Sequence, residues 1–300
     1  MTRVVTVGIA VMDKIFGVPE IPAEPTKVFA RSYKEIGGGP AATGAVAVAR
    51  LGGEAMLWAR VGDDPVGRRI VEEIAEWGVV PRIRLVPGAT SGVSGVLVDS
   101  RGERLIAAFA DPALDQDPSW LPLDELAGAG AVLADMRWPW ASEAVMRRAR
   151  EIGVPTVLDA DLAPDDVAHR LVALADYAVF SRPALARLAG LADPEAGLRA
   201  VRPLCPGVVG VTVGEDGFLW LDGDAVGHAR GLEVAAVDTL GAGDVFHGAF
   251  ALAIAEGRPI AVAARFANVA AGLKCTKPGG RAGIPTRAEV DALIPQSEEA

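Results

Sequence analysis

The stretch DTLGAGDVFHGAFALAIAEG, residues 238–257, joins two acids and a run of small residues to an apolar helical segment. Glycine is roughly 1 kcal/mol less favourable than alanine inside a helix, so structure alone favours other residues at this point. Small residues at a helix start leave backbone N–H groups open, and the helix dipole attracts anions to that end. The stretch therefore predicts an anion site at the start of a helix.

Asp244 lies in the same turn as these open N–H groups. A bound phosphate would repel this carboxylate, so its presence there indicates a chemical task. Accepting the proton of a hydroxyl that attacks the phosphate is such a task. The alternative is that Asp244 only completes the helix N-terminus electrostatically, but that role does not require the preceding Gly-Ala-Gly run.

Short apolar segments alternate with helical segments along most of the chain. Strands that are apolar throughout, with amphipathic helices between them, are typical of a parallel sheet covered on both faces. We therefore expect an α/β sandwich of three layers with a mostly parallel central sheet. The expected strands are residues 4–10, 131–135, 156–159, 177–181 and 208–213, and helices are expected at 41–52, 64–78, 142–153, 183–190 and after Asp244.

Residues 17–35 and 91–110 break this rhythm. The second segment has two strand-like runs joined by Asp-Ser-Arg-Gly, a turn sequence, and predicts a hairpin. We expect both segments to form a small β-layer, a candidate lid, with bounds of 14–35 and 90–111. The chain has no internal repeat or long linker, so residues 1–300 are predicted to be one domain.

Composition excludes several kinds of partner. The chain has 300 residues, 51% of them hydrophobic, and a net charge of −10. This acidic balance argues against nucleic acid and against an anionic membrane surface. The two cysteines lack a CxxC spacing, the start lacks a signal-peptide pattern, and no apolar stretch approaches the ~20 residues of a membrane helix. We expect a soluble, cytoplasmic protein.

Several polar residues follow the expected strands. Ligands bind at the carboxyl ends of strands in an open parallel sheet, so these residues predict a polar site on one edge. Each has an ordinary alternative, such as capping a turn or forming a local ion pair. The residues are Asp13, Asp135, Arg137, Asp159, Asp161 and Ser181.

Other motifs give little support to rival functions. No GxxxxGK[ST] motif occurs, so the chain is not a P-loop protein. A GxGxxA pattern at residues 37–42 is interrupted by Pro40, which makes a dinucleotide fold a weak alternative. The three histidines, His169, His228 and His247, share no metal-ligand spacing and are predicted to be surface or helix residues.

Two motifs carry a resemblance to a known family. DTLGAGD, followed by its apolar helix, resembles the C-terminal signature of the ribokinase (PfkB) family of sugar kinases, and GGGPAATGAVAVARLGG, residues 37–53, resembles its N-terminal signature. The match in strand and helix order extends to about Pro285. The resemblance implies a ribokinase-like fold and an ATP-dependent phosphotransferase that acts on a sugar hydroxyl.

The resemblance also implies roles for individual residues. Asp244 would be the catalytic base, and Gly241, Ala242 and Gly243 would form the anion hole for the transferred phosphoryl group. The sugar would be held by Asp13, Gly38, Gly39 and Thr43, the last standing where many members have Asn.

The nucleotide side is implied in the same way. ATP would lie over Thr212, Gly214 and Gly217, with Asn268 near the adenine or ribose, although an ordinary turn also explains the two glycines. Mg²⁺ would accompany ATP, held largely by phosphates and water. Asp238 would organise a loop that binds a monovalent cation such as K⁺, or would serve only the helix start.

One family element is altered. Where relatives have NxxE, which supports metal and phosphate binding, this chain has Ser181-Arg182-Pro183-Ala184. Asp159 or Asp161 would have to compensate, or catalysis would be weakened.

The chain is most similar to one branch, the sulfofructose kinases, in GIAVMDKI, GGGPAAT, VLADMRW, GAGDVFHGA and LKCTKPGGRAGIP. That branch implies that Lys27 and Arg137 face a sulfonate, although Lys27 could equally be a solvated lid charge. Its Asn near the second lid strand is replaced by Ala108, which removes a hydrogen-bond donor worth roughly 1.5–3 kcal/mol. Arg281 is left open between a nucleotide contact and a structural role.

The predicted reaction transfers the ATP γ-phosphate to a sugar primary hydroxyl, first of all O1 of 6-deoxy-6-sulfofructose. Alternatives are fructose, fructose 6-phosphate, ribose, a 2-keto-3-deoxy sugar acid or a nucleoside. A non-catalytic regulator that binds sugar or nucleotide is a rival from another class, suggested by the missing NxxE. Exposed apolar lid faces predict a homodimer.

Overall fold

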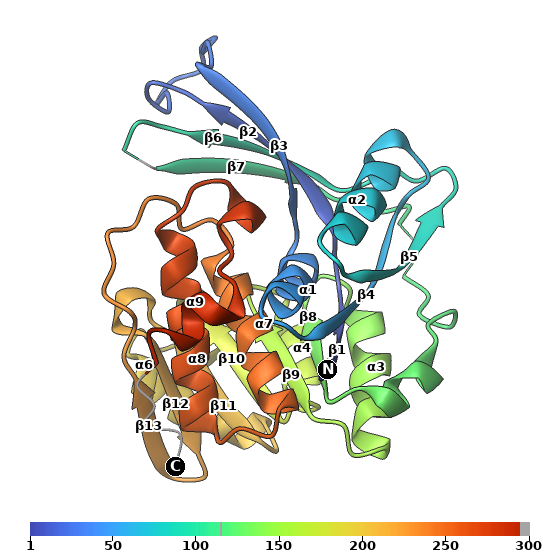
Figure 1. Cartoon of the computed structure of the whole chain (residues 1–300), viewed down its shortest axis with the longest axis vertical. Helices are drawn as coiled ribbons and strands as arrows, with labels where there is room; N and C mark the ends of the chain where they lie inside the picture. Colours follow the sequence, from blue (N-terminus) through green and yellow to red (C-terminus); the bar gives the residue numbers. More distant parts are fainter. Residues whose placement is uncertain (102, 115, 295–300) are drawn as a thin grey trace.

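The computed structural model describes residues 1–101, 103–114 and 116–294. Within these residues, nine strands form a central sheet and four form a second, smaller sheet (Figure 1). Gly102 of the expected hairpin turn and residues 295–300 of the expected domain lie outside the described residues.

The central sheet is mostly parallel, as the sequence predicts. Its last two strands, β12 and β13, add antiparallel to the β11 edge. Every residue of β8 and β9 is buried, as expected for strands covered on both faces. In sheet order the strands are β13 (Ala225–Ala229), β12 (Phe218–Asp222), β11 (Val208–Thr212), β10 (Tyr177–Ser181), β9 (Thr156–Ala160), β8 (Ala131–Asp135), β1 (Arg3–Val7), β4 (Glu54–Gly62) and β5 (Val80–Val86).

Helices cover both faces of this sheet and give two separate cores. Successive strand residues feed opposite cores, for example Val4 and Val5 of β1. Prolines begin several of the helices, at a position where the missing N–H is not needed. One face carries α1 (Pro40–Arg50), α2 (Pro65–Glu76), α7 (Ala242–Ala255), α8 (Ile260–Cys275) and α9 (Arg287–Asp291).

The opposite face carries α3 (Pro139–Glu151), α4 (Asp165–Val172), α5 (Arg182–Ala189) and α6 (Pro194–Val201). Short 3-10 turns complete the described elements: η1 (Leu123–Gly128), η2 (Arg202–Leu204), η3 (Gly214–Asp216) and η4 (Gly280–Gly283). No helix among the described residues is both long and apolar enough to span a bilayer.

The smaller sheet consists of β3 (Ser32–Gly38), β2 (Val11–Gly17), β6 (Val93–Val98) and β7 (Arg104–Phe109), in that order. It projects from the end of the central sheet and extends above the start of α7 and the end of α8 (Figure 1). Its strands come from the segments in which the sequence predicts a β-layer, but β2 begins and β3 ends three residues beyond the expected 14–35. We refer to this sheet as the lid sheet.

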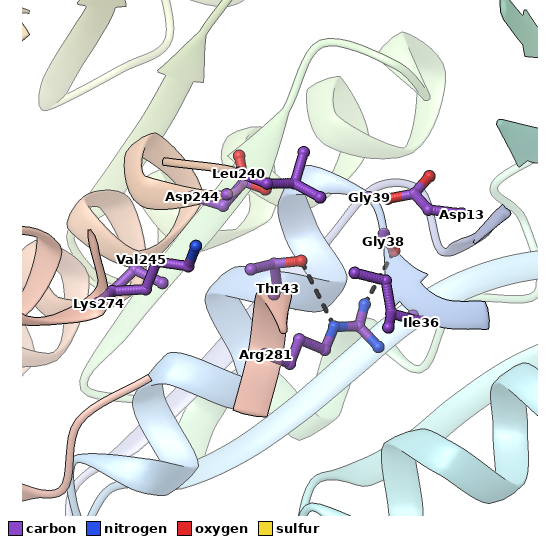
Figure 2. Close-up of a pocket in the computed structure, with 13 residues that line it drawn as sticks. Asp13, Ile36, Gly38, Gly39, Thr43, Leu240, Asp244, Val245, Lys274 and Arg281 are labelled. Carbon is purple, nitrogen blue, oxygen red and sulfur yellow. Dashed lines mark hydrogen bonds between the residues drawn. The ribbon is translucent and has the colours of Figure 1, made fainter. Parts of the chain in front are cut away.

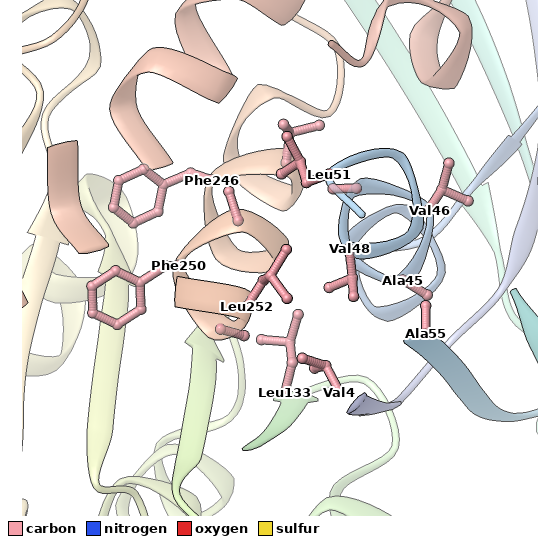
Figure 3. Packing of buried hydrophobic residues seen from close by; sticks show 14 of the residues in the cluster. Val4, Ala45, Val46, Val48, Leu51, Ala55, Leu133, Phe246, Phe250 and Leu252 are labelled. Carbon is pink, nitrogen blue, oxygen red and sulfur yellow. The ribbon is translucent and has the colours of Figure 1, made fainter. Parts of the chain in front are cut away.

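Helices α1 and α7 pack closely because both carry glycine at their contact (Figure 3). A Cβ on Gly248 would lie 2.4 Å from the carbonyl oxygen of Gly44, so a side chain at residue 248 would force the helices apart. Buried apolar side chains on both sides of this contact, including Val48 and Leu252, complete the packing. The contact brings the segments that hold the two family-like signatures side by side.

Candidate active site

The start of α7 has the geometry of an anion site. Gly241 precedes the helix with φ = 75°, a left-handed conformation that favours glycine. The helix begins at Ala242, and Asp244 lies in its first turn. The first backbone N–H groups of a helix have no partner within it, so this end is suited to a phosphate.

A cavity lies between this helix start and the Gly-rich turn before α1 (Figure 2). Its empty volume, including the part open to solvent, is about 330 Å³. The lining contains most of the predicted sugar and phosphoryl residues: Asp13, Gly38, Gly39, Thr43, Gly241 and Asp244, together with Lys274 and Arg281.

Asp244 is poised for proton transfer near neutral pH. Burial raises the pKa of its carboxyl to about 7, with a further contribution from Asp159, while His247 and Arg281 oppose the rise. A general base works best when its pKa lies near the working pH. The residue predicted to be the base thus has the acid strength that this role needs.

Asp159 and His247 lie near enough to Asp244 to shift its pKa, in opposite directions. The His247 Nδ1 lies 3.4 Å from an Asp159 carboxylate oxygen and 2.8 Å from the carbonyl oxygen of Gly243. Its Nε2 lies 3.2 Å from the carbonyl oxygen of Val179. Burial lowers the pKa of His247, whereas burial and nearby carboxylates raise that of Asp159 well above its usual range. Spacing alone gave no signal for His247, because its partners come from other elements.

Asp135 is structural in this arrangement. It lies directly beside Asp159 across β8 and β9. Its buried carboxylate accepts hydrogen bonds from the backbone N–H groups of Ile9 (2.9 Å), Ala41 (3.3 Å) and Arg137 (2.8 Å). Asp135 therefore joins the end of β1 to the start of α1, which positions the Gly-rich turn.

The predicted sugar residues meet at this turn. Asp13 lies on β2, and burial raises the pKa of its carboxyl although a hydrogen bond with Ser94 opposes the rise. A Cβ on Gly38 would lie 2.3 Å from an Asp13 carboxylate oxygen, and one on Gly39, at φ = 95°, would lie 2.5 Å from the carbonyl oxygen of Ile9. Only glycine leaves the Asp13 carboxylate open to the cavity.

Arg281 is buried and supports the Gly-rich turn before α1. Its guanidinium donates to the carbonyl oxygen of Gly38 (2.8 Å) and the hydroxyl of Thr43 (3.4 Å), as Figure 2 shows, and it forms an ion pair with Glu73. A Cβ on Gly37 would overlap this guanidinium. These contacts give Arg281 a structural place beside the Gly-rich turn and Thr43.

The predicted nucleotide residues lie apart from this cavity, around the connection of β11 to β12. Thr212 ends β11. Gly214, the first residue of η3, and Gly217, which follows η3, adopt positive φ values of 68° and 94°. The side-chain amide of Asn268 on α8 donates to the carbonyl oxygens of Ala229 (2.8 Å) and Arg230 (3.1 Å). Asn268 thus fixes the backbone at the end of β13.

The predicted sulfonate residues do not line the cavity. Arg137 pairs with Asp161 at 2.9 Å, and the hydroxyl of Ser181 donates to the other oxygen of Asp161 at 2.9 Å. Lys27 is exposed in the connection between β2 and β3. Ala108 stands in register with Ser94, which is in register with Asp13, so all three share one face of the lid sheet.

Among residues 1–101, 103–114 and 116–294, no three His, Cys, Asp or Glu side chains are grouped as a metal site. The Asp238 carboxylate accepts from the side chain of Arg104 (3.0 Å) and the backbone N–H of Leu240 (2.9 Å), and the Lys274 ammonium lies beside it. Asp238 is therefore surrounded by protein donors.

Comparisons with known proteins agree with this geometry. The description "pfkB family carbohydrate kinase" matches residues 1–287. A crystal structure of a candidate ribokinase from Agrobacterium tumefaciens is 41% identical, with a TM-score of 0.93, covering 97% of this chain and 96% of the other.

Two further relatives agree. A structure of Arabidopsis thaliana ribokinase complexed with ribose and ATP is 28% identical, with a TM-score of 0.86, covering 98% of this chain and 99% of the other. The ribokinase of Bacillus subtilis is 28% identical over 298 residues, which is 98% of this chain and 100% of the relative. With the helix N-terminus, the neighbouring carboxylates and the mostly parallel sheet, these matches show that the chain is an enzyme of the PfkB family of carbohydrate kinases, with a ribokinase-like fold.

Proposed function

We propose that this chain transfers the γ-phosphoryl group of ATP to a primary hydroxyl of a sugar held between Asp13 and Asp244. The observation that carries the proposal is the position of Asp244, whose pKa is about 7, at a helix N-terminus that faces the same cavity as Asp13. The base and the start of the anion site thus line one cavity.

In the proposed step, the sugar hydroxyl loses its proton to the Asp244 carboxylate as its oxygen forms a bond to the γ-phosphorus. The bond from that phosphorus to the bridging oxygen breaks, and ADP leaves with the electron pair. The N–H groups of Gly241 and Gly243 would stabilise charge on the transferred oxygens. The N–H of Ala242 donates to the carbonyl oxygen of Thr239 (3.2 Å) and would have to give up this partner to join them. The lid sheet would exclude water, which limits ATP hydrolysis.

The nucleotide and its cation are proposals at this stage. ATP would lie along Thr212, Gly214 and Gly217, with Asn268 shaping the adjacent backbone. Mg²⁺ would neutralise phosphate charge, with ligands mainly from phosphate and water. Asp161 accepts a hydrogen bond from Ser181 of the altered NxxE element and would be available to water on that ion.

The first candidate sugar is 6-deoxy-6-sulfofructose, phosphorylated on O1. Its support is the charge of Arg137 at the carboxyl end of β8 and of Lys27 on the lid sheet connection. Arg137 would have to turn from Asp161 toward the sulfonate, and closure of the lid would have to carry Lys27 inward. Ala108, on the sugar face beside Ser94, offers no donor.

The second candidate is an uncharged sugar, with ribose first. Two observations support it. Arg137 is paired with Asp161 rather than free to bind a sulfonate, and the side chain of Ala108 offers no hydrogen-bond donor. The ribokinases among the relatives are consistent with this candidate.

A coupled ATP-to-ADP assay tests these proposals. The panel contains sulfofructose, fructose, fructose 6-phosphate, ribose, a 2-keto-3-deoxy sugar acid and adenosine. Asp244→Asn should lower turnover by about 10²–10⁴-fold while nucleotide binding is retained. Wild-type turnover in that variant would refute the role of Asp244. Nucleotide or sugar binding without turnover on any member would favour the regulator.

Arg137→Ala then separates the two sugar candidates. If a sulfonate binds there, KM for sulfofructose rises at least tenfold and KM for ribose or fructose is unchanged. An equal effect on all sugars would assign Arg137 to the structure around Asp161.

We also propose a homodimer formed through the outer face of the lid sheet. Arg104 points toward Asp238, so its neighbour Leu105 points away, and Leu105 shares a cross-strand row with Phe16 and Tyr33. Tyr33 and Leu105 are 52% and 54% exposed. Covering this apolar row would need a second copy, and Leu105→Lys should therefore yield a monomer by light scattering.

A further inference from the structure

The predicted monovalent-cation site around Asp238 is already filled by protein groups. One carboxylate oxygen of Asp238 accepts from Arg104 (3.0 Å) and from the N–H of Leu240 (2.9 Å). The other accepts from the N–H groups of Gly279 (3.1 Å) and Gly280 (3.3 Å). A free ion that used these oxygens would have to displace several existing donors.

The backbone carbonyl oxygen of Asp238 also has a partner, the side-chain ammonium of Lys274. Lys274 lies in the last turn of α8, and its Nζ donates to the backbone carbonyl of Asp238 at 2.8 Å and lies 3.5 Å from the carboxylate. The residue is only 1% exposed, so this charge is committed to the interior. The carboxyl end of a helix is also where a cation is electrostatically favoured.

The ammonium of Lys274 joins the end of α8 to the segment before α7, which is the segment that a bound cation would have to hold. The segment before α7 is also held by the carbonyl of Cys275, which accepts from the N–H groups of Val237 (2.7 Å) and Asp238 (3.1 Å). Lys274 and Leu240 both line the cavity next to Gly241, and in Figure 2 they lie on the Asp244 side of it. The position of the anion site therefore depends on contacts made by Lys274.

K⁺ and an ammonium group are similar in size and charge, but they bind differently. K⁺ needs several oxygen ligands, whereas a lysine ammonium has three donors and is tethered to its own helix. Two cationic side chains, Arg104 and Lys274, already balance the single carboxylate of Asp238. A third positive charge would be repelled.

We propose that the ammonium of Lys274 replaces a free monovalent cation, so that the kinase works without K⁺. Only the measurement of activity depends on the proposed function, because it needs a sugar that the chain phosphorylates. Its structural part, that Lys274 holds the segment around Asp238 and Gly241 in the place of an ion, can be measured without any sugar.

The first measurement uses the wild-type chain. Melting temperatures and initial rates are compared in K⁺, NH₄⁺, Na⁺ and tetramethylammonium chloride at equal ionic strength, the last ion being too large for such a site. We expect no ion-specific shift in melting temperature and rates that agree within twofold. A selective K⁺ requirement, or selective stabilisation by K⁺, would overturn the proposal.

The second measurement makes room for an ion. Lys274→Ala should melt at a lower temperature in tetramethylammonium, recover in K⁺ or NH₄⁺, and regain at least tenfold activity with those ions. Lys277→Ala, which removes an exposed lysine paired with Glu289, is the matched control and should show neither effect. A Lys274→Ala variant that folds but ignores all four ions would refute the replacement.

The outcomes remain separable from failure of the proposed function. If no sugar is phosphorylated, the melting temperatures still decide the role of Lys274. If Lys274→Ala does not fold in any of the four salts, the comparison in the wild-type chain decides it alone.

Discussion

Replacing the catalytic base should make the protein more stable, and only above a certain pH. The pKa of Asp244 is raised from 3.8 to about 7 in the folded chain. Between these values the folded state binds a proton that the unfolded state releases, so ionising Asp244 costs stability as the pH rises. Asparagine carries no charge and avoids this cost.

The size of the effect follows from the pKa shift. One pKa unit corresponds to about 1.4 kcal/mol, so the two units between pH 5 and pH 7 amount to about 2.7 kcal/mol. Asp244 is half-buried at the cavity, so we discount this for solvent screening and expect roughly half, ~1.4 kcal/mol. For a chain of this size that is a rise in melting temperature of about 2 °C.

The assay is thermal unfolding of wild type and Asp244→Asn, without ligands, from pH 5 to pH 8.5. The advantage of Asp244→Asn should grow with pH and level off above about pH 8, where Asp244 is ionised in both states. Asp224→Asn, at an exposed turn, is the control and should show no such trend. A stability difference that does not change with pH, or a variant that is less stable at pH 8, would refute the reasoning.

Three further predictions concern the site. Asp159→Asn removes a negative neighbour and should move the acid limb of the kcat/KM profile, expected near pH 7 from the pKa of Asp244, to lower pH by about one unit; an unmoved limb would contradict the coupling. Gly38→Ala places a methyl against the Asp13 carboxylate and should raise KM for sugar at least tenfold with the melting temperature nearly unchanged; an unchanged KM would argue against Asp13 as the sugar contact. Ala108→Asn adds a donor on the sugar face and should lower KM for sulfofructose about tenfold; if KM falls equally for ribose, the residue does not face a sulfonate.

The main features of the fold follow from sequence patterns. Continuous apolar runs such as residues 131–135 predict strands buried on both sides, and the structure has β8 at those residues. Strand β5 was not predicted, because Arg82 and Arg84 alternate with apolar residues at a sheet edge that is half exposed. The antiparallel strands β12 and β13 were also missed, because the apolar run of β12 is only four residues long and β13 carries Gly227 and His228 among its five residues.

The candidate site was predictable where a short motif carries the chemistry. Asp244, Gly38 and Gly39 belong to such motifs and lie together at the cavity. The partners of Asp244 were not predictable, because Asp159 and His247 come from different elements and their contact depends on how α7 packs on the sheet. Lys274 was missed because a lysine near a helix end normally indicates exposure rather than a buried ammonium.

The hydrogen bond from Arg281 to the carbonyl of Gly38 joins residues that are 243 positions apart in the chain. Contacts between such distant segments form late, because closing a long loop must precede them. During synthesis on the ribosome, the Gly-rich turn therefore cannot form its contact with Arg281 until nearly the whole chain has been made. A sugar can stabilise the finished kinase, but it cannot guide the early steps of its folding during synthesis.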